Sequence, residues 1–509
     1  MKRSVAWKKY SDKDLAALED LASRYIDFIS DNKTERECAA AAIKAAEARG
    51  YVSLDEAVRG AQALKPGDKV WAQTHGKSLM LVQLGRVPLT SGFNILGAHI
   101  DSPRLDIKQN PLYESGDFAL LDTHYYGGIK QYQWVTLPLA LHGVIAKKDG
   151  TVVDVCVGED ANDPVFCVTD LLIHLAGEQM DKKASKVVEG EALDILVGNR
   201  PARSDEQGAN AGVGGDNALA DAGVGGAATD AANDAAGDNA GAGAGVAADA
   251  DAGEKEPVKA FVLSLLAEKY DITEEDFLSA ELEVVPAGRA RELGFDRSMV
   301  IGYGQDDRVC AFTSLDAQLA VCDELLEKTS VCILVDKEEI GSVGATGMAS
   351  LFFENTIAEI MELSGEGGML PLRRALEASA MLSSDVSAGY DPTYASVFET
   401  KNAAYLGRGL VFNKYTGSRG KSGSNDASAE YVARIRRVMD EADVSFQTAE
   451  LGKVDAGGGG TIAYIPAKYG MDVIDSGVAV LSMHAPWEVT SKADIYEARR
   501  GYEAFLRNA

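Results

Sequence analysis

SGFNILGAHIDSP, at residues 91–103, joins an apolar run typical of a buried strand to two polar side chains, His99 and Asp101. A His-x-Asp pair is common in proteins. Here the aspartate can accept a hydrogen bond from the imidazole nitrogen that faces away from a metal ion, which fixes the tautomer of the ring. We therefore interpret this stretch as a strand that ends at a metal site.

Four further stretches end an apolar run in the same way. They are GYGQDDR with Asp306 and Asp307, VDKEEIGS with Glu338 and Glu339, MLSSDV with Asp385, and VLSMHAP with His484. Helix caps or solvated acidic pairs would explain each one singly, but not their shared position after apolar runs. Two histidines and several carboxylates suit divalent zinc, cobalt or manganese, so the set predicts a two-metal hydrolase. Asp306 could bridge the ions, and one glutamate would remain to move protons.

The chain beyond Asp296 alternates strand-like apolar runs with amphipathic helical segments. This alternation favours an α/β fold in which a mostly parallel sheet is flanked by helices, with ligands beyond the carboxyl ends of its strands. Capping residues and apolar spacing also predict helices over about residues 11–29 and 34–50. We expect residues 1–104 and 297–509 to form one catalytic domain.

The intervening residues 105–296 are rich in β-branched and aromatic residues broken by glycine turns, which predicts an inserted, mainly β domain. One helix is expected around DLLIHLAGEQM, residues 170–180. Residues 204–256 are largely Gly, Ala, Asp and Asn, with eleven acidic residues against Lys255 alone. Such a stretch buries too little apolar area to offset its ordering entropy, so we predict a disordered acidic loop. An acidic tether for a partner is the alternative.

Length and composition restrict the class of protein further. A chain of 509 residues exceeds the size at which single cores stop growing, and its net charge of −28 argues against nucleic acid as a partner. No apolar run approaches the roughly 18 residues that cross a bilayer, and the N-terminus lacks the apolar core of a signal peptide. The six cysteines form no CxxC pair, which speaks against a thiolate zinc site. We expect a cytoplasmic protein without membrane attraction.

Together the motifs resemble the aspartyl aminopeptidase family of dinuclear zinc exopeptidases. The resemblance includes KTERE (33–37), GSNDASAEY (423–431) and SMHAPWE (482–488), and it covers the chain apart from the acidic loop. It implies a zinc exopeptidase fold with an inserted dimerisation domain, and homodimers assembled into a tetrahedral homododecamer. It also implies a metalloaminopeptidase with two zinc ions per subunit that releases an N-terminal Asp or Glu from peptides.

The resemblance further implies the ligands of each metal ion. His99 and Asp385 would bind one zinc ion. His484 and Glu339 would bind the other, and Asp306 would bridge the two.

Roles outside the metal ligands follow from the same resemblance. Glu338 would be the general base, and Asp101 would orient His99. His174 would reach the active site of a neighbouring subunit, although the family often has a second histidine four residues earlier, where this chain has Asp170.

The choice of substrate leaves alternatives open. Lys414, Arg419 and Lys421 lie in FNKYTGSRGKSGSNDAS, and one of these cations could pair with an acidic first side chain of a peptide. A dizinc aminopeptidase of neutral or broad specificity is the alternative, as is a carboxypeptidase or deacylase whose basic pocket binds a terminal carboxylate. A non-enzymatic shell or cargo protein would be marked by a missing ligand, and all the ligands are present.

Overall fold

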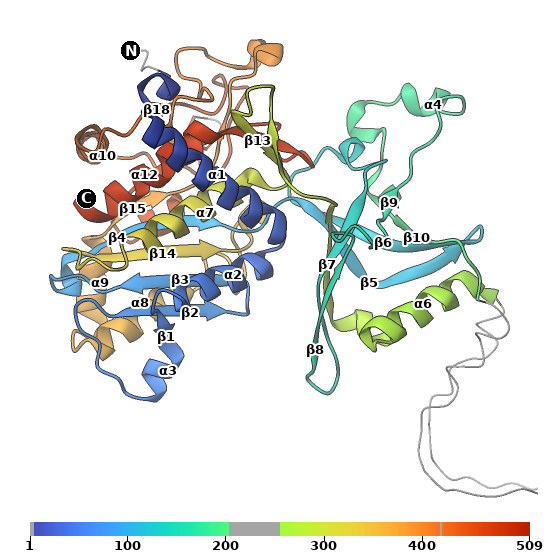
Figure 1. Cartoon of the computed structure of the whole chain (residues 1–509), viewed down its shortest axis with the longest axis horizontal. Coiled ribbons are helices and arrows are strands. Elements are labelled where there is room, and N and C mark those ends of the chain that lie inside the picture. Colours follow the sequence, from blue (N-terminus) through green and yellow to red (C-terminus); the bar gives the residue numbers. More distant parts are fainter. Residues whose placement is uncertain (1–4, 203–254, 418–419) are drawn as a thin grey trace, which may run out of the picture.

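The computed structural model describes residues 5–202, 255–417 and 420–509. Nearly all of the predicted acidic loop, and Arg419, lie outside the described residues. The chain forms a larger layered body that holds both ends of the chain, and a smaller, mainly β body beside it (Figure 1). Among the described residues, every helix is too short or too polar to cross a lipid bilayer.

A nine-stranded sheet lies at the centre of the larger body. In spatial order its strands are β1 (Val52–Ser53), β2 (Lys69–Thr74), β3 (Ser78–Gln83), β14 (Thr329–Val335), β4 (Phe93–His99), β15 (Ala380–Ser383), β19 (Asp472–Gly477), β17 (Leu410–Asn413) and β18 (Phe446–Thr448). The run from β14 through β4 and β15 to β19 is parallel, whereas β3 and β17 join it in antiparallel fashion. The predicted mostly parallel sheet is confirmed.

Helices cover both faces of this sheet (Figure 1). One layer contains α1 (Asp12–Asp31), α2 (Glu35–Glu47), α7 (Gln305–Ala320), α10 (Ala429–Glu441) and α12 (Lys492–Asn508). The other contains α3 (Leu54–Arg59), α8 (Phe352–Leu363), α9 (Met369–Glu377) and α11 (Tyr464–Ala467). In strand β3, Leu81 packs against the first helix layer, and its neighbours Met80 and Val82 pack against the second. Strands buried on both faces need continuous apolar runs, which is why every residue of β14 is buried.

The first two helices begin where their capping residues predict. The Ser11 side chain accepts a hydrogen bond from the Asp14 N–H, and Thr34 does the same for Glu37. In each case the acidic side chain accepts a hydrogen bond from the backbone N–H of the cap. Both helices therefore start with two of their otherwise unpaired N–H groups satisfied.

The smaller body is built on a seven-stranded sheet. Its strands, in order, are β8 (Val152–Val157), β7 (Leu139–Ala146), β11 (Ala280–Pro286), β5 (Arg104–Ser115), β6 (Phe118–Tyr126), β10 (Ile195–Gly198) and β9 (Cys167–Val168), and α6 (Pro257–Tyr270) packs on it. The helix expected over residues 170–180 is wrong, because only α4 (Gly177–Met180) is helical there. Leu171, Leu172, Ile173 and Leu175 remain exposed instead. Without a core to pack against, their apolar pattern does not produce a helix.

The KTERE stretch ties the two bodies together. The Lys33 ammonium donates hydrogen bonds to Glu159 at 2.5 Å and to the carbonyl of Pro286 at 2.7 Å. His142 of β7 lies between Glu37 at 2.7 Å and Glu159 at 3.1 Å. Charged groups buried at such a junction fix its geometry, because leaving one partner unpaired would be costly.

A third sheet, of five short strands, completes the larger body. Its strands, in order, are β12 (Arg291–Leu293), β13 (Met299–Gly302), β21 (Glu488–Ser491), β20 (Ala479–Leu481) and β16 (Ser387–Ala388). The pairings β13–β21 and β21–β20 are antiparallel. The sequence did not predict this sheet as separate from the central one.

Candidate metal centre

Three of the five sequence stretches end at one edge of the central sheet. His99 is the last residue of β4, Glu338 and Glu339 follow β14, and Asp385 follows β15. Since β14, β4 and β15 are parallel neighbours, their carboxyl ends meet at the same edge. This is the position at which α/β sheets bind ligands.

The other two stretches come from the five-stranded sheet. Asp306 follows β13 after a turn at Gly304, and His484 follows β20. Gly304 has a φ of 66°, and a Cβ there would lie 2.6 Å from the Ser102 hydroxyl oxygen, so only glycine fits this turn. The site is therefore assembled from two sheets, not from the ends of one.

Asp306 stands between the two histidines. Its Oδ1 lies 3.2 Å from Nε2 of His99, and its Oδ2 lies 3.2 Å from Nε2 of His484. His484 Nε2 is also 3.5 Å from Glu339 Oε2. One carboxylate thus faces a different imidazole with each of its oxygens.

The ligand atoms form overlapping groups of metal-binding size. The groups His99, Glu338, Asp385 and His99, Asp306, Glu339 each have ligand atoms within 4.8 Å of one another. Asp306, Asp307 and Asp385 form a third such group. The donors are imidazole nitrogens and carboxylate oxygens, the set that zinc, cobalt and manganese accept.

Several of these carboxyl groups are buried in a way that disfavours their negative charge unless a cation is bound. Burial raises the pKa of Glu338 to about 7, and the charges of Asp306 and Asp101 add to the effect. Burial likewise raises the pKa of Glu339 and of Asp385 well above the ordinary range. Glu339 Oε1 and Asp306 Oδ1 are buried without a hydrogen bond. A divalent cation would satisfy such oxygens and keep the carboxyls ionised, so the residues fit a divalent metal centre.

Asp101 holds several parts of the centre at once. The imidazole Nδ1 of His99 lies 3.3 Å from Asp101 Oδ1 and 3.0 Å from its backbone carbonyl. The same carboxylate accepts hydrogen bonds from the backbone N–H groups of Glu338 and Glu339, each at 3.1 Å. Asp101 therefore contacts one histidine and holds the turn that carries both glutamates by two hydrogen bonds.

Glu488, the first residue of β21, is a residue of the site that sequence reasoning missed. Its carboxylate accepts hydrogen bonds from the backbone N–H of Asp306 at 3.0 Å and of His484 at 2.7 Å. It is buried, and burial raises its pKa to about 8. The available signal was a glutamate four residues after the histidine in SMHAPWE, at the start of an otherwise uncharged strand.

A cavity of about 440 Å³ opens onto these ligands. Its polar lining comes from the metal-binding candidates and from Ser342, Asn413, Thr416 and Thr461, and Gly458, Gly459 and Gly460 form part of its wall. Leu451, Tyr464 and Met483 add apolar surface. The volume suits part of a peptide, with glycines that let a backbone approach closely.

None of the described residues predicted to bind substrate lines this cavity. Lys414 and Lys421 both pair with Asp426, Lys421 at 2.9 Å, and neither lines the cavity. Arg419 lies outside the described residues. His174 is exposed in the turn before α4, in the smaller body.

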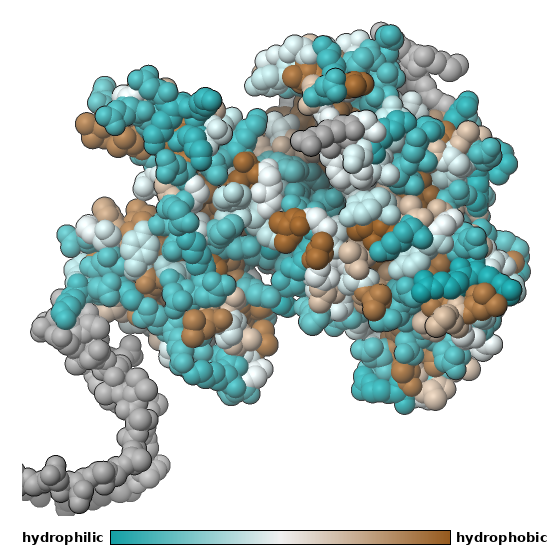
Figure 2. All heavy atoms as spheres, turned by 180° about the vertical axis from the view of Figure 1, so that it is seen from behind, coloured by the Kyte–Doolittle hydropathy of each residue, from teal (hydrophilic) through white to brown (hydrophobic). Residues whose placement is uncertain are grey.

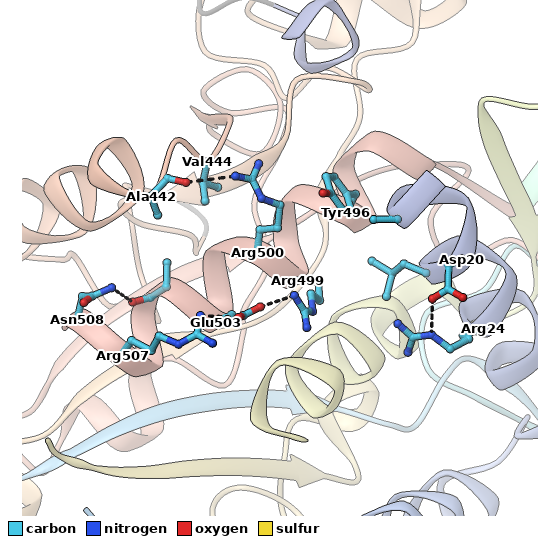
Figure 3. A pocket seen from close by; sticks show the side chains of 13 residues that line it. Asp20, Arg24, Ala442, Val444, Tyr496, Arg499, Arg500, Glu503, Arg507 and Asn508 are labelled. Carbon is cyan, nitrogen blue, oxygen red and sulfur yellow. Dashed lines mark hydrogen bonds and ion pairs between the residues drawn. The ribbon is translucent and has the colours of Figure 1, made fainter. Parts of the chain in front are cut away.

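A second hollow, of about 560 Å³, lies between α1 and α12 and shares no lining residue with the first (Figure 3). Its arginines are paired, Arg24 and Arg499 with Asp316, Arg500 with Glu497, and Arg507 with Glu324. Because carboxylates already neutralise these guanidinium groups, the hollow offers little attraction to an anion.

Comparisons with known proteins agree with the geometry. A family model described as aminopeptidase I zinc metalloprotease (M18) matches residues 28–506. A probable M18 family aminopeptidase 1 from Clostridium acetobutylicum is 58% identical over 503 residues, 99% of this chain and 98% of the relative. A protein of the same description from Thermotoga maritima is 39% identical over 507 residues, 99% of each chain.

Solved structures of M18 aminopeptidases also match this chain over its whole length. The crystal structure of an M18 family aminopeptidase from Thermotoga maritima matches with a TM-score of 0.86 and 39% identity, covering 100% of both chains. Aminopeptidase I from Clostridium acetobutylicum matches with a TM-score of 0.82 and 56% identity, again over 100% of both chains. The zinc exopeptidase fold is thereby confirmed.

Proposed function

The chain belongs to the M18 family of zinc metalloproteases and is an aminopeptidase, and we propose that it releases an N-terminal Asp or Glu from peptides with two zinc ions. The observation that carries the two-ion proposal is the carboxylate of Asp306, which faces His99 with one oxygen and His484 with the other. Cobalt or manganese would suit the same donors.

Each ion has a proposed ligand set. His99 and Asp385 hold one zinc ion, and His484 and Glu339 hold the other. Asp306 is shared between them. The 3.5 Å separation of His484 Nε2 and Glu339 Oε2 supports the second set, and the grouping of His99 with Asp385 supports the first.

The remaining residues handle protons and orientation. Bound zinc would supply Lewis acidity that lowers the pKa of water towards about 7. Glu338 accepts a proton from the attacking water as the oxygen adds to the first peptide carbonyl. It then gives that proton to the amine nitrogen as the C–N bond breaks. Asp101 keeps His99 in the tautomer that faces the metal.

The cavity must also accept the side chain of the N-terminal residue of the peptide. The family resemblance supports an acidic residue, which the Asn413 amide and the Thr416 hydroxyl could receive as hydrogen-bond donors. A neutral or broad specificity is the second candidate, because no lysine or arginine is found among the described residues that line the cavity. The two candidate specificities differ in the ratio of kcat/KM for an aspartyl substrate to that for a leucyl substrate.

We expect kcat/KM for an aspartyl anilide to exceed that for the leucyl anilide at least about tenfold, equal to about 1.4 kcal/mol of transition-state binding. Glutamyl and lysyl anilides complete the panel. An N-acetylated aspartyl anilide serves as the control and should not be cleaved, because an aminopeptidase requires a free amino group. A leucyl or lysyl preference would refute the acidic specificity and leave the aminopeptidase activity standing.

We also propose that residues 105–296 act as an inserted dimerisation domain between the two parts of a catalytic domain, 1–104 and 297–509. Hydrophobic surface is visible at the outer end of the smaller body (Figure 2, upper left). Ile173 and Leu175 of that body are 67% and 68% exposed, which supports this role. His174 between them would reach a neighbouring active site. The structure of a yeast protein of 17% identity is described as a dodecamer. We propose that this chain forms cytoplasmic homodimers and that these assemble into a homododecamer.

A further inference from the structure

A short segment of the smaller body, residues 126–128 at the end of β6, reaches into the metal centre. We infer that this segment positions both metal-binding histidines and Glu339, so that the smaller body completes the active site of its own chain. The inference rests on the proposed function and concerns residues that contact the ligands, not the ligands themselves. Tyr126, Gly127 and Gly128 each make a different contact.

Tyr126 completes the hydrogen bonding of Asp101. Its ring is buried, and its hydroxyl donates to Asp101 Oδ2 at 2.8 Å. That oxygen also accepts the N–H of Glu339, and the other oxygen accepts the N–H of Glu338. The tyrosine hydroxyl therefore helps to hold the one carboxylate that orients His99 and carries the glutamate turn.

Arg104 holds the tyrosine ring in place. The guanidinium carbon lies 3.9 Å from the centroid of the Tyr126 ring, a cation–π distance. Arg104 is itself buried and pairs with Asp106 at 2.8 Å and Glu283 at 3.1 Å. These two partners lie on strands β5 and β11, and a third, Glu35 of α2, lies 3.6 Å away in the larger body, so the Tyr126 ring is held where the two bodies meet.

Gly128 orients the second histidine. Its backbone carbonyl accepts a hydrogen bond from His484 Nδ1 at 2.8 Å. This bond fixes the tautomer in which Nε2 is free to face Asp306 and Glu339. A Cβ on Gly128 would lie 3.5 Å from Nδ1, so the imidazole lies directly against the backbone.

Gly127 allows the segment to approach Glu339. Its φ is 76°, a conformation that favours glycine. A Cβ there would lie 3.3 Å from both Cβ and Oε2 of Glu339, and 3.4 Å from Cβ of Pro103. A larger residue would therefore press on a proposed zinc ligand.

Tyr126→Phe tests the hydroxyl, with Tyr125→Phe as the matched control. Tyr125 is the preceding residue of the same strand, points to the opposite side and is 40% exposed. The measurements are zinc affinity by chelator competition, the absorption spectrum of the cobalt-substituted protein, and melting temperature. We expect Tyr126→Phe to weaken the affinity for at least one ion about 10-fold or more and to change the cobalt bands. Tyr125→Phe should match the wild type.

Gly127→Ala tests the close approach, with Gly116→Ala as its control. Gly116 lies at the other end of the same hairpin with a φ of 61°, and a Cβ there meets nothing within 4 Å. Both variants should lower the melting temperature of the metal-free protein, because both strain the backbone, and Gly127→Ala should lower it more because its Cβ also meets Glu339 and Pro103. Only Gly127→Ala should also weaken zinc binding.

The wild type separates this inference from the proposed function. If the wild type holds two zinc ions and cleaves aminoacyl anilides, the proposed two-zinc aminopeptidase stands, whichever residue it prefers. In that case, unchanged zinc affinity and cobalt spectra in both Tyr126→Phe and Gly127→Ala would show that the segment has no positioning role.

Discussion

Glu338→Gln is expected to lower kcat/KM by about 10²–10⁴-fold while both metal ions stay bound, because the amide cannot accept a proton from water. The carboxylate lies 4.0 Å from His99 Nε2, and its side chain is 15% exposed at the wall of the cavity. The turn that carries it is held through its backbone N–H by Asp101. Glutamine keeps that hydrogen bond and the size of the side chain, so the substitution isolates proton transfer.

The control is Glu359→Gln, which makes the same chemical change at an exposed position of α8. Steady-state kinetics on the preferred anilide, elemental analysis and melting curves should be recorded on both variants. The control should match the wild type in all three. If Glu338→Gln turns over at the wild-type rate with full metal content, another group is the base.

The central part of this site could be predicted because three of its strands are parallel and buried on both faces. Such strands read as continuous apolar runs, and the residue after each run is placed at the ligand-binding edge. This applies to His99, to the Glu338–Glu339 pair and to Asp385. For these residues the local sequence alone therefore predicts the position in the fold.

The five-stranded sheet gave a weaker signal: Asp306 and His484 follow apolar runs, but nothing in the sequence showed that those runs form a sheet of their own. Its strands have two to four residues, too few to show a period of two, and β21 begins with the buried Glu488. The function of that glutamate depends on backbone N–H groups of Asp306 and His484, and the former is 182 residues away. A contact between segments so far apart in sequence leaves no local pattern.

One other expectation fails for a reason of tertiary contact, and the substrate role of the cations stays a prediction. The apolar residues Leu171, Leu172, Ile173 and Leu175 lie exposed and so gain no packing energy from a helix. Lys414 and Lys421 are close in sequence to the cavity lining, yet Asp426 in the same segment pairs with both. Sequence proximity identified the cations and could not identify their partner.

Asp306→Ala is expected to disturb both metal sites, because each oxygen of the carboxylate faces a different histidine at 3.2 Å. Removing it leaves each ion with one histidine and one carboxylate, and it also removes the charge that holds the ions close together. Zinc content should fall below one ion per subunit, as measured by elemental analysis after dialysis against a weak chelator.

Asp385→Ala is the control, because its zinc content shows what the loss of a ligand to one ion does. Asp385 groups with His99 and lies away from the pair formed by His484 and Glu339 in the proposed ligand sets. Its loss should therefore empty one site and leave roughly one ion per subunit. If Asp306→Ala instead retains one fully occupied site, as Asp385→Ala does, the carboxylate serves a single ion. The two-ion centre would then need a different bridge, for which Asp307, buried beside Asp306 and Asp385, is the nearest candidate.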